Sequence, residues 1–193
     1  MARGKGFDDL TAVTAARDVF WERGYGSTSL AQLQAATGLS KSSLYETYGS
    51  KRDLFGRCAQ NYLDLVIGPR IAPLETGDAG KDVLVRYFSD LAELFRTAPD
   101  RLARRGCLLL NTATDLNDLD AAAAGLVRDY RDRVRTAFLA VARRVRVADP
   151  EHRAELLTAG QIGLMVTSRL DPALAAGLAD ALAREVAGWE PVS

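Results

Sequence analysis

Apolar residues recur every three or four positions along most of the chain, and no useful stretch alternates apolar and polar residues at the period of a strand. The clearest repeat lies in residues 126–145, whose apolar positions fall on one stripe of a helix: Leu126, Tyr130, Val134, Phe138, Val141 and Val145. Glycines, prolines and N-cap residues divide the rest of the pattern into segments. The sequence therefore predicts an all-α protein of about nine helices.

The fourth helix in this pattern has clear signals at both ends. Ser50 and Asp53 are spaced as a capping box, and we expect the helix that they open to run to Gly68 and Pro69. The polar, glycine-containing segment 74–82 follows as a predicted loop.

Helix starts in the C-terminal part of the chain are marked by proline. Residues 101–116 are predicted to hold one short helix. Asp149 precedes Pro150, and Asp171 precedes Pro172, so each pair places an N-cap residue before a proline at the first helical position. We therefore expect the last two helices to begin at these pairs.

Two short predicted helices flank a turn at residues 37–40, and Leu33, Leu39 and Leu44 are placed to pack between them. This arrangement matches a helix-turn-helix, whose second helix enters the DNA major groove. A helix in a groove about 12 Å wide must be slim and polar on its outer face. The candidate residues of the second helix and its cap are Ser40, Lys41, Ser42, Ser43 and Thr47.

Further polar residues are predicted to contact phosphates and so position the second helix. Tyr45 and Tyr48 offer phenolic hydroxyls, and Lys51 adds positive charge. Thr28 and Ser29 lie at the N-terminus of the preceding helix, where free N–H groups and the helix dipole favour an anion. The alternative is an ordinary helical hairpin, in which the tyrosines pack in the core and Lys51 is a solvated cap residue.

Residues 27–55, STSLAQLQAATGLSKSSLYETYGSKRDLF, resemble the DNA-binding region of the TetR family of bacterial transcriptional regulators. The features follow the order of that family, with Gly38 in the turn, Leu44 and Tyr45 in the second helix, and Leu54 and Phe55 beyond it. Together with the first helix, which ends in the pair Gly24 and Tyr25, the ordered set extends over about fifty residues. It is therefore much more specific than any single one of its parts.

The resemblance implies a division of the chain into two domains. Residues 1–50 are expected to form a three-helix DNA-binding domain, and residues 51–193 a helical domain for ligand binding and dimerisation. The resemblance also implies a homodimer that binds a palindromic operator. Most members of the family repress transcription until an inducer binds.

Three residues depart from the family pattern. Gln34 stands where the family usually has a small or apolar residue, so it must turn outward or find a partner. Glu46 puts negative charge on the second helix, and Thr47 replaces a frequent histidine. These differences concern the sequence and affinity of the operator more than the fold.

Cys107 is a candidate regulatory thiol. It follows Arg101, Arg104 and Arg105 near a predicted helix start, and both conditions lower the pKa of a thiol. The segment GCLLLN also resembles a branch of the family that includes electrophile- and oxidant-responsive repressors. The alternative is that Cys107 packs as a small apolar residue among the leucines that follow it, as we expect for Cys58 in the core.

The last two helices are predicted to form a four-helix dimer interface. The contributing residues are Ala159, Gly160, Gly163, Leu174, Leu178, Leu182, Val186 and Trp189. A monomer could instead bury both helices against its own core. Dimerisation is favoured because a symmetric operator needs two recognition helices about 34 Å apart.

Composition excludes several classes of function. The formal net charge is zero, so any contact with nucleic acid must be local. We expect a cytoplasmic protein without membrane contact, because the chain has no leader-like start and no apolar run of about 18 residues. His152 is the only histidine, and no metal-ligand spacing or phosphate-binding glycine loop occurs, so no enzyme activity, metal or cofactor is expected.

The predicted function is that of a DNA-binding regulator, a repressor that an inducer releases from a palindromic operator. The inducer is either a lipophilic small molecule held between the fourth to seventh helices or an electrophile that modifies Cys107. The alternatives are a helical small-molecule-binding protein and a thiol enzyme, each without DNA function.

Overall fold

The computed structural model describes residues 8–113 and 121–192, and within these ranges the chain is helical and contains no strand. This confirms the predicted all-α fold. The helices are α1 (Asp9–Arg23), α2 (Leu30–Thr37), α3 (Lys41–Tyr48), α4 (Lys51–Tyr62), η1 (Leu63–Ile67), α5 (Gly68–Glu75), α6 (Lys81–Thr97), α7 (Asp100–Ala103), α8 (Leu108–Thr112), α9 (Ala121–Val145), α10 (Pro150–Leu170) and α11 (Pro172–Ala187).

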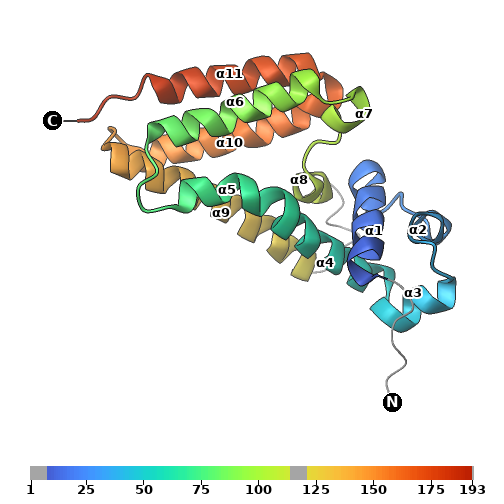
Figure 1. The fold of residues 1–193 in the computed structure, drawn as a ribbon. Coiled ribbons are helices and arrows are strands. Elements are labelled where there is room, and N and C mark those ends of the chain that lie inside the picture. The colour runs from blue at the N-terminus through green and yellow to red at the C-terminus, as the bar shows by residue number, and fades with distance from the viewer. Residues whose placement is uncertain (1–7, 114–120, 193) are drawn as a thin grey trace.

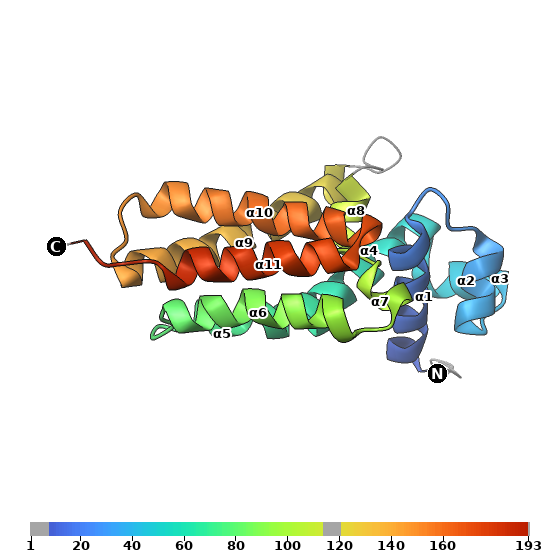
Figure 2. The ribbon, with the colours of Figure 1, turned by 90° about the horizontal axis from the view of Figure 1, so that it is seen from above.

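The molecule is elongated, with α1, α2 and α3 at one end and the long helices α6, α9, α10 and α11 at the other (Figure 1). Helix α4 leads from the first group into the second, and the short helices α7 and α8 lie where the groups meet. The view from above shows α11 lying along α6 and α10, with the chain's C-terminus far from α3 (Figure 2).

The fourth helix does not end at Gly68 and Pro69 as the sequence suggested. The chain passes through the π-helical segment η1, in which the N–H of Gly68 donates to the carbonyl of Leu63, and continues as α5 to Glu75. Pro69 follows directly on η1, and the wider π-helical turn accommodates its ring and its missing N–H within a continuous helical path. The predicted loop at 74–82 is correspondingly shorter, because α6 already begins at Lys81.

The predicted starts of α4, α10 and α11 are confirmed, and only the side-chain cap of α10 is missing. Ser50 and Asp53 form the capping box of α4, and the Asp171 carboxylate accepts hydrogen bonds from Ala173 N (2.9 Å) and Leu174 N (3.1 Å). Asp149 precedes α10 but makes no side-chain cap, because its backbone is left-handed, with φ 50° and ψ 58°.

The predicted single helix in residues 101–116 is wrong. The described part of this segment belongs to two short helices, α7 and α8, and positions 114–116 lie outside the described residues. The chain turns between these helices at Gly106, whose φ of +65° is in the left-handed region that glycine adopts without strain.

The hydrophobic core follows the stripe predicted on α9. Tyr130, Val134, Phe138 and Val141 are buried, while the ends of the stripe are half-buried. Phe138 contacts the aromatic rings of α6, its centroid 5.4 Å from that of Tyr87. Among the described residues, none of the helices combines the length and apolar character that crossing a membrane requires.

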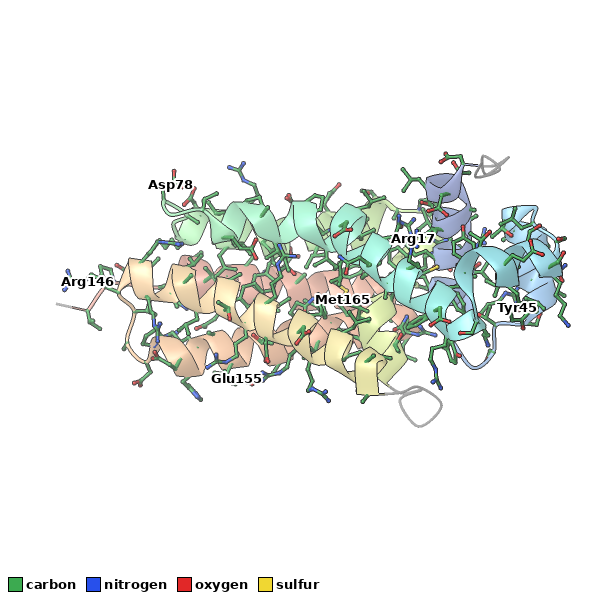
Figure 3. The ribbon with its side chains drawn as sticks, turned by 90° about the horizontal axis from the view of Figure 1, so that it is seen from below. Arg17, Tyr45, Asp78, Arg146, Glu155 and Met165 are labelled. Carbon is green, nitrogen blue, oxygen red and sulfur yellow. The ribbon has the colours of Figure 1, made fainter. Side chains whose placement is uncertain are left out.

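Contacts from α1 fix the N-terminal helices to the rest of the molecule. The Trp21 ring packs edge-to-face on Tyr62 at 4.8 Å, and its Nε1 donates to the carbonyl of Gly106 at 3.2 Å. Arg17, which Figure 3 shows at this junction, donates from Nη1 to Oδ1 of the buried Asn61 at 2.9 Å. The orientation of α3 is therefore set by side chains that join α1 to α4 and to the α7–α8 turn.

Candidate nucleic-acid interface

The turn between α2 and α3 has the expected scaffold. Leu33 and Leu44 are buried, Leu39 is half-buried, and Gly38 ends α2 in the left-handed conformation with φ 70°. Ser40 caps α3 by accepting from Ser43 N at 3.1 Å. The apolar contacts and the cap thus hold α3 as a separate short helix on the surface.

Four exposed side chains share the outer face of α3. Lys41, Ser42, Tyr45 and Glu46 are exposed and are spaced by one and four residues, which places them side by side on a helix. The Tyr45 side chain is 44% exposed, a high value for a large aromatic residue. Figure 3 shows Tyr45 near the extreme end of the molecule, away from the bundle. This face is free to meet a large flat or grooved partner.

The predicted hydroxyl residues lie around this face. Ser40 is exposed, while Ser43 and Thr47 are half-buried at its edges. The Oγ of Ser40 lies 2.9 Å from that of Ser42 and 3.0 Å from that of Ser43, so the hydroxyls form a connected group at the start of α3. Ser29 is exposed and forms a capping box with Gln32 at the start of α2.

Thr28 and Tyr48 lie mainly inside the scaffold, which differs from the predicted phosphate-facing arrangement. Thr28 is only 2% exposed, and its hydroxyl donates to the carbonyl of Gly24 at 2.6 Å. Tyr48 is 6% exposed and donates to Oδ1 of Asp9 at 3.0 Å. Burial and the neighbouring Asp9 carboxylate raise the pKa of Tyr48. In this structure both hydroxyls join parts of the protein to one another.

Lys51 likewise stabilises the scaffold. Its Nζ donates to the carbonyl of Tyr25 at 2.7 Å and lies 4.4 Å from the centre of the Tyr25 ring. The side chain therefore ties the start of α4 to the loop that follows α1. The sequence indicated a charge at this position but not its partner, because the two residues are 26 positions apart.

The departures from the family pattern are also placed by the structure. Gln34 is half-buried on α2, and Glu46 is exposed in the middle of the outer face of α3. The carboxylate of Glu46 consequently lies among the groups predicted to approach DNA, where it would repel phosphates and can accept from a base amine.

A cavity of about 250 Å³ lies in the body of the molecule, behind the N-terminal helices. Its walls come from α1, α4, η1, α5, α6, α7, α9 and α10, together with the α7–α8 turn. Met165, which lines it, lies in the middle of the molecule in Figure 3. The lining is mainly aromatic and aliphatic, so the cavity suits a small, largely apolar ligand.

Polar groups in this cavity were missed by the sequence reading. The buried Gln161 donates from Nε2 to the hydroxyl of Tyr130 at 3.1 Å, and Tyr62 and Tyr87 also line the space. Burial is the main cause that raises the pKa of all three tyrosines, so they remain neutral hydrogen-bonding groups. The one sequence signal for these groups was Gln161, a polar residue on the apolar face of α10.

Cys107 is buried, with 1% exposure, immediately before α8. The three arginines that precede it have carboxylate partners: Arg101 pairs with Glu22, Arg104 with Asp100 and Arg105 with Asp18. Their charges are therefore directed at carboxylates. The burial of Cys107 therefore favours the alternative that it packs as a small apolar residue over a role as an accessible reactive thiol.

Cys58 lies in the core, as the sequence predicted. Its Sγ donates to the carbonyl of Val13 at 3.5 Å, and burial raises the pKa of the thiol to about 12. Across residues 8–113 and 121–192, no group of three or more His, Cys, Asp or Glu side chains is arranged to hold a metal ion.

An apolar stripe is exposed on the last two helices. On α10 and α11 its members are Leu156, Ala159, Gly163, Val166, Leu170, Leu174 and Leu178. Three residues predicted for a dimer interface lie elsewhere. Val186 and Trp189 are buried in the protomer's own core, and Leu182 packs against Gly160, because α11 also lies along α6 and buries that side.

Comparison with known proteins agrees with this geometry. Residues 12–58 match the model of the bacterial regulatory proteins, tetR family. The chain is 34% identical over 115 residues to the uncharacterized HTH-type transcriptional regulator YezE of Bacillus subtilis (strain 168), a match that covers 60% of this chain and 58% of YezE. It is also 34% identical over 116 residues to the HTH-type transcriptional repressor ComR of Escherichia coli (strain K12), covering 60% of this chain and 54% of ComR.

The fold is found in a solved protein–DNA complex. A cysteine mutant of the TetR family transcriptional regulator CifR, bound to 26-bp double-strand operator DNA, superposes with a TM-score of 0.79. The alignment covers 97% of this chain and all of that chain at 24% sequence identity. The similarity to the bacterial regulatory proteins of the tetR family therefore lies in residues 12–58, from α1 into α4, while the likeness to CifR extends over the fold of nearly the whole chain.

Proposed function

We propose that this protein is a dimeric, DNA-binding transcriptional repressor that acts in the cytoplasm and is released from a palindromic operator by an inducer. The observation that carries the proposal is the exposed polar face of α3, held on a buried apolar scaffold. ComR is a transcriptional repressor, and CifR binds double-strand operator DNA. These similarities, together with the exposed face of α3, support an equivalent role for this chain.

The proposed DNA contacts fall into two groups. Lys41, Ser42, Tyr45 and Glu46 face the major groove, with Ser43 and Thr47 at the edges. Ser29 and Ser40 stand at helix N-termini, where backbone N–H groups favour phosphate oxygens. Thr28, Tyr48 and Lys51 act indirectly, by holding α3 and the start of α4 in place.

The domain division follows from the same arrangement. Residues 1–50 read DNA, and residues 51–193 bind the inducer and form the dimer. Helix α4 belongs to the second domain by sequence, yet it contacts α1 and lines the cavity at Tyr62. A ligand that moves α4 therefore changes the position of the DNA-binding helices, provided that ligand and operator favour different positions.

Dimerisation is proposed through the exposed stripe on α10 and α11. Val166 lies in the middle of this stripe and is 52% exposed. We expect Val166→Arg to yield a monomer in light scattering, because the arginine charge would be buried without a partner in the interface. Leu65→Arg is the matched control, since Leu65 is also 52% exposed but lies on η1. A dimer that persists in Val166→Arg would contradict this interface.

For the inducer, the cavity is favoured over the thiol. It offers about 250 Å³ of mainly apolar space with several polar groups, whereas Cys107 is buried and the neighbouring arginines are paired. Replacement of Cys107 by Ser is therefore expected to leave operator release by the inducer unchanged. A loss of release in Cys107→Ser would favour the electrophile mechanism instead.

The proposed function is tested by fluorescence anisotropy of the full chain with duplex from upstream of its own coding sequence, at fixed salt and with random duplex as competitor. We expect saturable binding that resists the competitor. Lys41→Ala should weaken it about tenfold or more, because two phosphate or base contacts are lost per dimer, and should lower the slope of log K against log salt. Arg86→Ala, which removes an exposed charge from α6, is the matched control.

If the protein does not bind the upstream duplex, bound sequences are selected from a pool of random duplexes. Recovery of a palindromic site would support the proposal with an operator elsewhere. An empty selection with folded, dimeric protein would overturn it and favour a helical small-molecule-binding protein without DNA function.

A further inference from the structure

The inner cavity has an unusual balance of charge for an apolar space. Its lining includes the guanidinium groups of Arg70 and Arg105 but no aspartate or glutamate. The other walls are mainly aromatic and aliphatic side chains, with the hydroxyls of tyrosines and the amide of Gln161. The cavity is therefore apolar and positive, a combination that favours an anion with an apolar body over a neutral or cationic ligand.

The two arginines differ in how far their charge is satisfied. Arg105 is mostly buried, stacks on Trp21 at 5.3 Å and lies 3.7 Å from the Asp18 carboxylate, but its buried Nε has no hydrogen-bond partner among the described residues. A buried donor without an acceptor costs free energy, which a ligand oxygen would relieve.

Arg70 is an exposed residue of α5 that lines both the cavity and the outer groove. Its positive charge opposes the dominant effect of burial on the pKa of Tyr62 and of Tyr87, and both tyrosines line the same cavity. In the described part of the chain it has no ion pair or hydrogen bond with another side chain. Arg70 can therefore turn its bidentate N–H groups to a ligand without breaking an existing contact.

The cavity also has an approach from outside. A groove of about 450 Å³ between α5 and α6 shares Arg70, Tyr87 and Leu94 with the inner cavity. The acidic residues of this region, Asp90 and Glu93, line the groove and not the cavity. Arg70 and Tyr87 thus stand where the outer groove adjoins the inner cavity.

We propose that the inner cavity binds a small apolar monoanion of the aromatic carboxylate class, with its carboxylate at Arg70 and its ring among the aromatic walls. This inference rests on the proposed function, in which the cavity is the inducer site. The carboxylate forms charge-assisted hydrogen bonds with Arg70, and the ring contacts the side chains that line the inner end.

The test uses calorimetric titration of the full chain with two probes of equal size, 2-naphthoate and its neutral amide, 2-naphthamide. We expect one naphthoate to bind per chain, with an affinity about tenfold or more above that of the amide, as charge-assisted hydrogen bonds require. Arg70→Gln should remove this preference. Arg86→Gln is the matched control, because Arg86 lines only the outer groove, and it should keep the preference.

Three outcomes would overturn the proposal. They are equal binding of acid and amide, an unchanged preference in Arg70→Gln that remains folded by thermal unfolding, and no saturable binding of either probe. Operator binding by the same preparation separates these results from failure of the proposed function. Protein that binds operator but not naphthoate remains a regulator with a different inducer class, whereas protein that binds naphthoate but no duplex refutes the regulator function alone.

Discussion

Tyr45 and Tyr48 are three residues apart on α3, yet the structure gives them opposite roles. Tyr48→Phe removes the hydroxyl that donates to Asp9 at 3.0 Å. A hydrogen bond to a charged acceptor contributes about 1.5–3 kcal/mol. Asp9 keeps a second partner, since Nη2 of Arg57 lies 2.8 Å away, so no carboxylate is left unpaired. We therefore expect a loss near the lower limit, about 1.5 kcal/mol, or a fall in Tm of roughly 3–6 °C.

Tyr45→Phe is the matched variant, because it removes the same atom from an exposed side chain. Its free energy of unfolding should change by less than about 0.5 kcal/mol, while operator affinity falls. Tyr48→Phe should show the reverse, with lower Tm and near-normal operator affinity in anisotropy at 20 °C or below. Equal Tm values for the two variants would refute the assigned hydrogen bond, and an affinity loss confined to Tyr48→Phe would refute the assigned outer face.

Three other predictions concern stability and reactivity. Gly106→Ala should lower the free energy of unfolding by about 2 kcal/mol or more, because φ is +65° and the new Cβ would lie 2.9 Å from the carbonyl oxygen of Met165. Gly125→Ala is the control, since the added Cβ meets open space on a helix and should not destabilise the protein. Cys58, with its pKa raised to about 12, should resist a thiol reagent at pH 8 until the protein unfolds. Arg101 lowers the pKa of Glu22, so the small stability that Arg101→Gln loses should be present at pH 7 and be lost as the pH falls below the ordinary pKa of glutamate and through the lowered pKa of Glu22; thermal unfolding at pH 7 and at acidic pH measures this difference.

Local patterns in the sequence predicted much of the fold. The stripe on α9, the Ser50–Asp53 capping box and the buried pair Leu33 and Leu44 depend on residues close together in the chain, so spacing was sufficient to find them. Pro69 was misread because proline usually ends a helix, and a π-helical turn that accommodates it has no sequence signature.

The candidate site was less predictable where its contacts are long-range. The exposed face of α3 follows from helical periodicity, but the burial of Tyr48 depends on Asp9, which is 39 residues away. The cavity is harder still, because Arg70, Tyr130 and Gln161 come from three helices whose packing brings them together. Spacing within one segment carries no information about such an encounter.

The π-helical segment η1 also fixes the angular phase between the two ends of the molecule. It lies between α4, which packs on α1, and α5, which lines the cavity, and its wider turn holds one residue more than a regular α-helical turn. Loss of a single residue from Leu63–Ile67 would restore a regular helix and leave α1–α3 at nearly the same angle about the rod formed by α4 and α5, because the π turn had taken up that residue. In the proposed dimer, which would present both copies of α3 to one side of a duplex, this turn lets the rod carry one additional residue without misaligning the pair, whereas a residue lost from the regular α-helical part of the rod would rotate α3 by roughly 100°.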